Sequence, residues 1–293
     1  MARRKSPVWL ACAWLASLSF SGPVARSQRQ DPPPPRRPEA KKAAWLHEVY
    51  LRDASEYEFS LELAGRPRLE LRREPAMRWT SAGDYNGEVY VWTHRGAAAV
   101  VGCIFSGPDG DGGRRVLHEF HSLAPQPLVS GGRGGSGWQP AEAGVAPEPI
   151  PDASEPSEGK VLRLAQMRDL ARRFSAQVDR QGGMSEMRLL PQPLYRYEVT
   201  DGGPIVDGAV FAFVWTAGTD PEVLLVVEAR RTDGGARWHF APARFTNREA
   251  RVRYRGKEVW RADAATPGLF DGVTTKRYGA FSVKTVTDPS DTP

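Results

Sequence analysis

Cysteine is scarce in this 293-residue chain, which contains only Cys12 and Cys103. Cys12 lies in an N-terminal segment that we expect to be removed, so the mature chain cannot form an internal disulfide. Cysteine pairs with the spacing of metal ligands are absent as well. The protein must therefore be held together by its hydrophobic core, which is feasible because about 250 residues bury roughly 70 % of their unfolded surface.

Long apolar runs are also missing. A bilayer-spanning helix needs about 20 apolar residues, whereas the run from Val8 to Phe20 has thirteen. It follows a basic start and precedes small residues, which is typical of a signal peptide, here residues 1–27. Cys12 leaves a lipoprotein cleavage site open, although Trp9 stands where such sites take a small aliphatic residue. We expect an exported protein, periplasmic or extracellular, without a transmembrane segment.

Net charge on the folded part of the chain is low, although the whole chain carries +5 and has a pI near 9.3. Residues 1–42 hold nine Lys or Arg against two acidic residues, which leaves about −2 on residues 43–293. A nucleic-acid-binding protein carries its basic patch on the folded domain. The charge distribution therefore argues against a nucleic-acid partner.

Motifs of known catalytic and cofactor sites are absent or incomplete. The chain has no Gly-x-Ser-x-Gly elbow and no Walker loop. Gly132-x-Gly134-x-x-Gly137 matches the glycine pattern of the dinucleotide fingerprint, but we do not expect it to bind a dinucleotide because no helix is expected after it. Asp109-x-Asp111 opens like a calcium loop but lacks the distal glutamate, so a hairpin turn is the better interpretation. We expect no cofactor and no metal.

An internal repeat is the main positive feature of the sequence. Five short matches recur in the same order in the two halves, at separations of 116 to 122 residues. Ordered matches at a nearly constant separation predict two diverged copies of one unit. The matches are Arg52-Asp53 with Arg168-Asp169, Pro75-x-x-Arg78 with Pro193-x-x-Arg196, Gly87–Trp92 with Gly208–Phe213, Phe120 with Phe240, and Trp138 with Trp260.

The repeat predicts an α+β fold, a tandem repeat of a helix followed by a curved antiparallel β-sheet in two pseudo-symmetric units. Apolar residues at three- and four-residue steps predict the second helix from Val161 to Val178. Valine-rich and aromatic runs bounded by glycine or proline predict hairpins that turn at His94-Arg95-Gly96, at Gly218–Pro221 and at Arg255-Gly256. The predicted parts are a signal peptide (1–27), a proline-rich spacer (28–42), a first unit (43–123), a Gly/Pro-rich linker (124–160), a second unit (161–286) and a disordered tail (287–293).

The string His118-Glu119-Phe120-His121 carries the most suggestive side chains. It is not the His-Glu-x-x-His motif of metalloproteases, whose histidines share one helical face. On a strand, Glu119 and His121 point to one face while His118 and Phe120 point to the other. A structural role is the simpler interpretation, and a weak site formed by Glu119 and His121 is the alternative. Cys103 has no identifiable base and is interpreted as a small buried apolar residue.

Charged residues present in both copies are interpreted as scaffold. We expect Arg78 to pair with Asp53, and Arg196 with Asp169, where a strand meets the helix of its unit. Function is expected where the copies differ, namely at His118, Glu119 and His121 in the first copy and at Thr219-Asp220-Pro221-Glu222 in the second.

The strings Leu189–Tyr197, Asp207–Phe213 and His118–Leu123 resemble a family of exported proteins common in planctomycete bacteria. The resemblance runs from the first helix to about Trp260. It implies export and a bacterial source, and it brings no known activity, ligand or catalytic residue.

Two functions remain after these exclusions. The first is a non-catalytic exported protein that binds a small ligand or an envelope partner between the two units. The alternative is an exported hydrolase that uses Glu119 and His121, which requires a pocket containing both side chains and a shifted pKa in at least one of them. The absence of a catalytic motif favours the first function, and it leaves the ligand and the oligomeric state open.

Overall fold

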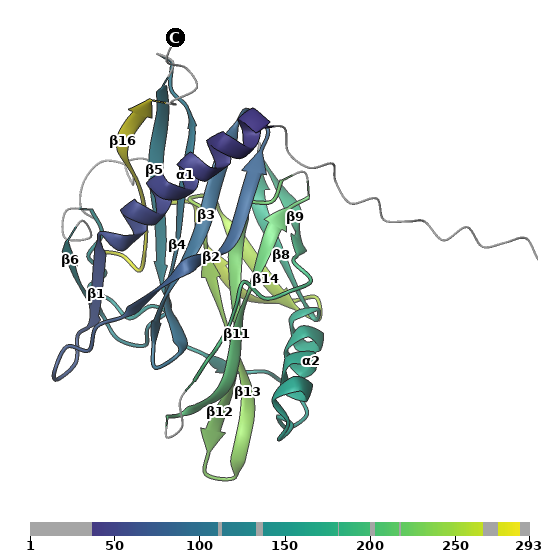
Figure 1. Cartoon of the computed structure of the whole chain (residues 1–293). Coiled ribbons are helices and arrows are strands. Elements are labelled where there is room, and N and C mark those ends of the chain that lie inside the picture. The colour runs from purple at the N-terminus through teal and green to yellow at the C-terminus, as the bar shows by residue number, and fades with distance from the viewer. Residues whose placement is uncertain are drawn as a thin grey trace, which may run out of the picture. The chain divides into compact units, whose positions relative to one another are not determined.

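The computed structural model describes residues 37–110, 113–132, 137–180, 182–199, 203–216, 218–265 and 275–287. This part of the chain is mostly antiparallel β-structure, with two helices, α1 (Arg37–Ser55) and α2 (Lys160–Ala171) (Figure 1). Neither helix is long and apolar enough to cross a membrane. The predicted signal peptide lies outside the described residues, and α1 begins inside the predicted proline-rich spacer.

The first sheet has five antiparallel strands in the order β16-β5-β4-β3-β2. A separate two-stranded ribbon, β1 (Tyr57–Leu61) with β6 (Leu128–Gly132), lies beside it. The predicted hairpin around His94-Arg95-Gly96 is confirmed by the pairing of β3 with β4. The strands of the first sheet are β2 (Glu70–Ser81), β3 (Tyr85–His94), β4 (Ala97–Pro108), β5 (Gly113–Ser122) and β16 (Tyr278–Thr287).

The second sheet has nine strands and curls around its own core. Its order is β15-β14-β8-β9-β11-β12-β13-β7, with β10 paired to β11. The predicted hairpins β11–β12 and β14–β15 are confirmed. Its strands are β7 (Glu148–Pro149), β8 (Phe174–Arg180), β9 (Gly183–Leu189), β10 (Tyr195–Arg196), β11 (Ile205–Trp215), β12 (Pro221–Thr232), β13 (Gly235–Arg244), β14 (Ala250–Tyr254) and β15 (Lys257–Ala262).

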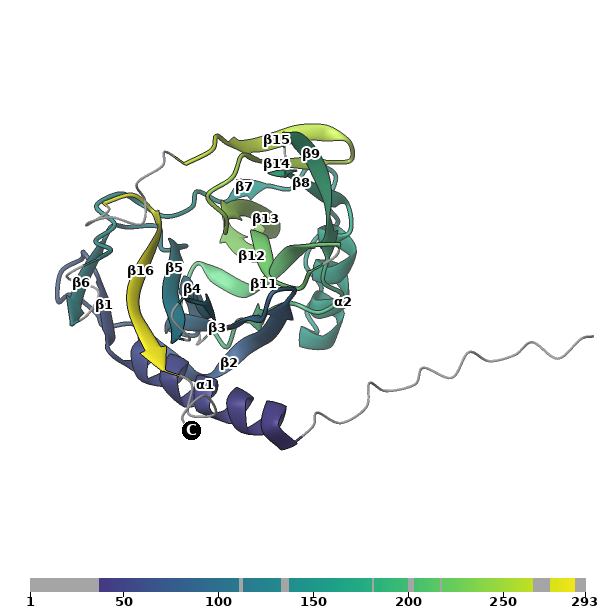
Figure 2. The ribbon, with the colours of Figure 1, turned by 90° about the horizontal axis from the view of Figure 1, so that it is seen from above.

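The central strands are buried on both faces, which explains their nearly continuous apolar sequences. In β12, Leu224 and Val226 pack in the layer between the two sheets, whereas Val223, Leu225 and Val227 pack in the core of the second sheet. Figure 2 shows β11 and β12 next to the first sheet, with β8 and β14 farther away. Period-two alternation thus distributes one strand between two cores.

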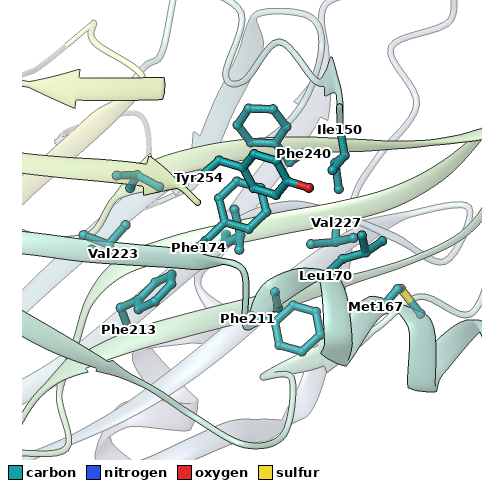
Figure 3. Close-up of a cluster of buried hydrophobic side chains, with 14 of the residues drawn as sticks. Ile150, Met167, Leu170, Phe174, Phe211, Phe213, Val223, Val227, Phe240 and Tyr254 are labelled. Carbon is teal, nitrogen blue, oxygen red and sulfur yellow. The ribbon is translucent and has the colours of Figure 1, made fainter. Parts of the chain in front are cut away.

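Three apolar clusters follow from this arrangement. One lies between α1, the β1–β6 ribbon and the first sheet, and one lies between the two sheets. The third fills the curl of the second sheet, where α2 covers it and Phe174 packs against Phe240 and Tyr254 at ring distances of 4.9 and 4.8 Å (Figure 3). The layer between the sheets is the one that contains the candidate site.

The predicted fold class, an α+β tandem repeat of a helix-plus-sheet unit, is wrong. The structure has 56 % strand and 13 % helix, with large curled antiparallel sheets in the described residues. The two sheets differ in strand number and order. In addition, β16 lies at the end of the predicted second unit but pairs with β5, and β7 from the predicted linker joins the second sheet.

The predicted second helix is too long for a physical reason. It ends at Ala171 instead of Val178, because the apolar residues from Phe174 onward alternate and form β8. Phe174, Ala176 and Val178 are buried while their neighbours are not. The apolar spacing of three and four residues in α2 is followed directly by the two-residue spacing of β8. Phe174 and Val178 fit both spacings, which is why the sequence did not show where the helix ends.

The predicted linker is also part of the folded protein. It contributes β6 and β7, and Trp138, which lies between these two strands in the sequence, is fully buried in the structure. The Trp138 ring stacks on Phe120 at 5.3 Å, and its indole N–H donates a hydrogen bond of 2.9 Å to the backbone oxygen of Lys276. A large aromatic residue in a Gly/Pro-rich segment was the signal that this segment packs on the core.

Candidate functional site

A cavity of about 220 Å³ opens at one end of the layer between the two sheets. The first sheet contributes Glu119 from β5 and Tyr278 from β16, and the second contributes Arg180 at the end of β8. We call this cavity the Glu119 pocket. Its other polar walls are Asp220, Glu222, Thr246, Asn247 and Arg248, and its aromatic walls include Trp79, Phe105 and Phe245.

Glu119 is the central polar group of the pocket. Its Oε1 atom accepts a hydrogen bond of 2.5 Å from the hydroxyl of Tyr278. Burial raises the pKa of Glu119 to about 8, and the neighbouring Glu222 and Asp220 act in the same direction. The Tyr278 hydrogen bond and the charge of Arg244 oppose this shift and do not cancel it. At neutral pH the Glu119 carboxyl group is therefore mainly protonated.

Glu222 lines the same pocket as a member of an ion pair. Its buried carboxyl group contacts the Arg180 guanidinium, which lies 4.1 Å above the ring of Trp215. Burial is the main cause of its raised pKa, which the Thr246 hydroxyl and Arg180 partly offset. Stacking on a tryptophan fixes the guanidinium, so this ion pair is a rigid part of the wall.

Arg244 lies behind Tyr278 and completes the polar surroundings. Its guanidinium is 5.1 Å from the centre of the Tyr278 ring and donates hydrogen bonds of 2.9 Å to the backbone oxygens of Thr246 and Arg248. Burial lowers its pKa, while Tyr278 and Glu119 raise it. The loop after β13 is thereby held against the first residue of β16.

Cys103 lines the same pocket but is not a nucleophile. Its thiol accepts a hydrogen bond of 3.3 Å from the indole N–H of Trp79. Burial raises its pKa well above the ordinary value, and Glu119 acts in the same direction. A thiol with a raised pKa stays protonated and unreactive, which agrees with the interpretation of Cys103 as a small buried residue.

His121 shares a face of β5 with Glu119 but is not part of the pocket wall. It is buried, and its Nδ1–H donates a hydrogen bond of 2.7 Å to the backbone oxygen of Ser122. Burial lowers its pKa to about 4, so the ring is neutral at pH 7. Its ring lies 6.3 Å from that of Tyr278, which contacts both residues. The predicted Glu119–His121 pair is thus adjacent without sharing one cavity.

His118 points to the other face of β5, as the alternation predicts. Its Nε2 atom lies 3.0 Å from Asp53 of α1, and its Nδ1 atom lies 2.5 Å from the hydroxyl of Tyr57. Asp53 also accepts a hydrogen bond of 2.5 Å from Lys284 of β16. His118 and Asp53 are both fully buried, so this cluster joins α1 to the first sheet and has no access to a ligand.

The predicted scaffold ion pairs are wrong in their partners. Arg78 pairs with Glu88 at 2.8 Å, because the two residues lie directly opposite each other in the β2–β3 register. Arg196 pairs with Asp207 at 2.8 Å. Asp169 is an exposed residue that pairs with Arg173 one helical turn away. Strand register, which the repeat did not specify, decided the partner of Arg78.

The two segments in which function was expected, one around Glu119 and one at Thr219–Glu222, lie close together in the structure. Glu119 of β5 and Asp220, Pro221 and Glu222 at the start of β12 line one pocket, and the Thr219 hydroxyl bonds to the backbone oxygen of Thr80 at 3.1 Å. Sequence reasoning missed Tyr278, Arg180 and Arg244. Pairing of β16 with β5 brings Tyr278 to the site, and no local pattern in the sequence announces that pairing.

A search of family models, of curated proteins and of solved structures finds no match to this chain. Within the described residues, no group of three or more His, Cys, Asp or Glu side chains is placed to hold a metal ion. The Asp111 and Gly112 positions of the calcium-like turn, and Gly134 of the dinucleotide-like string, lie outside the described residues. The function must therefore be argued from the Glu119 pocket.

Proposed function

We propose that the protein binds a small uncharged ligand in the Glu119 pocket, through a hydrogen bond donated by the protonated Glu119 carboxyl group, and that it does so without catalysis. The sequence pattern of residues 1–27 supports an exported protein, and the family resemblance agrees with it. Both remain predictions. The ligand site lies between the two sheets, in place of the interface between duplicated units that the sequence suggested.

The observation that carries the proposal is the hydrogen bonding of Glu119. Oε1 is occupied by the Tyr278 hydroxyl, so the proton of the neutral acid belongs on Oε2. Within the described part of the chain, Tyr278 is the only hydrogen-bond partner of this carboxyl group, and Glu119 lines the cavity. A carboxylic acid kept neutral at pH 7 is a strong hydrogen-bond donor. A carbonyl, ether or hydroxyl oxygen of a ligand is the matching acceptor.

The charge balance of the pocket supports an uncharged ligand. Its lining residues carry Asp220 and Glu222 against Arg180 and Arg248, while Glu119 is mainly neutral at pH 7. The nearby Arg244 does not line the cavity, and its guanidinium donates to the backbone oxygens of Thr246 and Arg248. The pocket walls therefore carry no excess of positive or negative charge that would compensate a charged ligand. Burying an uncompensated charge is costly, so uncharged polar molecules fit the site better.

The surroundings of Glu119 also favour binding over hydrolysis. Cys103 is a protonated thiol, and His121 is buried outside the pocket wall. A hydrolase based on Glu119 and His121 requires both side chains at the reacting atoms. One observation does favour proton-transfer chemistry as a second candidate, because a pKa of about 8 suits a general acid at neutral pH.

One experiment distinguishes the two functions. The protein, Glu119→Gln and Glu119→Leu are purified under native conditions, and the small molecules that each carries are identified by mass spectrometry. Glutamine keeps the shape and a donor of the neutral acid, so binding predicts the same molecule in the unaltered protein and in Glu119→Gln, and its loss in Glu119→Leu. A molecule retained only by Glu119→Gln would indicate a trapped substrate and support the hydrolase. A molecule retained equally by all three proteins would refute a role of Glu119.

A further inference from the structure

A second cavity of about 230 Å³ lies between the same two sheets, at the other end of two shared strands. Strand β4 reaches it with Ala97–Ala99 and reaches the Glu119 pocket with Cys103 and Phe105. Strand β12 likewise contributes Glu228 and Arg230 to the second cavity, and Pro221 and Glu222 to the Glu119 pocket. The two cavities are therefore separate sites in one layer.

The walls of the second cavity are mainly apolar. They include Leu63, Ala97, Leu123, Val145, Pro204 and Ile205. Leu63 is 43 % exposed at its edge, which is unusual for a large apolar side chain. Apolar side chains from several separate segments thus surround a space that no side chain of the described residues fills.

The charged groups on its walls are either paired or exposed to solvent. Glu228 accepts a hydrogen bond of 2.9 Å from the hydroxyl of Tyr197 and one of 2.7 Å from the guanidinium of Arg230. Burial lowers the pKa of His94, which keeps its ring neutral at pH 7, and Arg95 is exposed to solvent. Among the described residues, the cavity therefore presents no buried, unpaired charge that would select an ion.

Backbone hydrogen bonds fix the wall segments relative to one another. Glu198 N–H donates to the oxygen of Gly96 at 2.9 Å, Leu123 N–H to that of Ala99 at 2.8 Å, and Arg231 N–H to that of Pro204 at 2.8 Å. Gly96 has φ +77°, and a Cβ there would lie 1.9 Å from the oxygen of Glu198, so only glycine permits this approach. The backbone segments around this cavity are thus fixed, and pre-formed apolar cavities are typical of ligand sites.

We propose that this second cavity binds a small, uncharged, mainly apolar molecule of about nine non-hydrogen atoms, independently of the Glu119 pocket. The size follows from its volume, since an apolar cavity of about 150 Å³ holds one benzene molecule. Indole has this size and no charge. It is the probe for the class, and benzoate and benzylammonium are charged probes of similar size.

The test is isothermal titration calorimetry of the full chain with the three probes. Indole is expected to bind one site per chain, while both charged probes bind at least tenfold more weakly. Ala97→Phe, which fills the cavity, is expected to weaken indole binding at least tenfold. Ala262→Phe is the matched control, because Ala262 is also a partly exposed strand residue but does not line the cavity.

A second variant guards against a folding defect in Ala97→Phe. Leu63→Arg places a charge at the exposed edge and is expected to weaken indole binding, whereas Val161→Arg, at an 81 % exposed position of α2, is expected to have no effect. Glu119→Leu is also expected to leave indole binding unchanged, which separates this site from the proposed function. Absence of indole binding, unchanged binding in both Ala97→Phe and Leu63→Arg, or tighter binding of either ion would each overturn the proposal.

Discussion

The hydroxyl of Tyr278 lies 2.5 Å from Oε1 of Glu119, although the two residues are 159 positions apart in the sequence. Pairing of β16 with β5 brings them together. The Arg244 guanidinium lies 5.1 Å from the centre of the Tyr278 ring. The candidate site therefore depends on the last described strand of the chain. The hydroxyl donor Tyr278, the acid Glu119 and the nearby cation Arg244 come from three different strands, β16, β5 and β13.

Glu119 should make the protein less stable as the pH rises from about 4.5 to 8. Its pKa is about 8 in the folded protein and close to 4.5 when unfolded, so the folded state binds more protons in this range. The stability that Glu119 contributes is complete below pH 4.5 and is lost progressively as the pH rises to 8. Urea unfolding of the protein and of Glu119→Gln measures it. The difference in free energy between the two should change with pH over this range, and a constant difference would contradict the raised pKa.

His121 should have the opposite effect at lower pH. Its pKa is about 4 in the folded protein against about 6.5 when unfolded, so the unfolded state binds more protons between these values. The stability that the folded protein gains from the neutral His121 ring is complete above pH 6.5 and is lost as the pH falls to 4. His121→Asn keeps a donor for the Ser122 oxygen and does not titrate. We expect the loss of stability between pH 6.5 and 4 to be smaller in this variant than in the unaltered protein, by thermal unfolding in matched buffers.

Tyr278→Phe should destabilise the protein and raise the pKa of Glu119 further. The substitution removes a hydroxyl whose hydrogen bond lowers that pKa, and it leaves Oε1 without its donor. Loss of one partner from a buried hydrogen bond costs about 1–3 kcal/mol. Carboxyl resonances followed by NMR over a pH titration measure the pKa directly. A titration unchanged from that of the unaltered protein would show that the Tyr278 hydroxyl does not bond to Glu119 in solution.

Strands and hairpin turns were largely readable from the sequence, whereas their assembly was not. The turns at Arg95-Gly96 and Arg255-Gly256 were predicted, and in both the Arg–Gly pair has positive φ. Such turns and the alternating residues around them are local features. The pairing of β16 with β5 and the curl of the nine-stranded sheet depend on contacts between distant segments, which a local pattern does not encode.

The candidate site was predictable to the same extent. Alternation along β5 correctly placed Glu119 and His121 on one face and His118 on the other. Comparison of the two copies named Glu119, Asp220 and Glu222 as candidate residues, but the fold does not support the repeat, and the repeat does not explain why these residues meet. Sheet-to-sheet packing is the reason, and it also positions Tyr278, Arg180 and Arg244, which lie in segments without a distinctive motif.

Asp53 and Asp169, both interpreted from the sequence as scaffold, should differ strongly in their effect on stability. Asp53 is fully buried and bonded to His118 and Lys284, so Asp53→Ala leaves these two groups without their shared partner. Removing one member of a buried ionic cluster costs about 3–5 kcal/mol. Asp169 on α2 is 60 % exposed and forms an i,i+4 surface pair with Arg173, which lies just beyond the helix, and such pairs contribute about 0.3–0.5 kcal/mol. Chemical denaturation of Asp53→Ala and Asp169→Ala compares the two. Equal losses in the two variants would show that the buried cluster does not fix α1 to the first sheet.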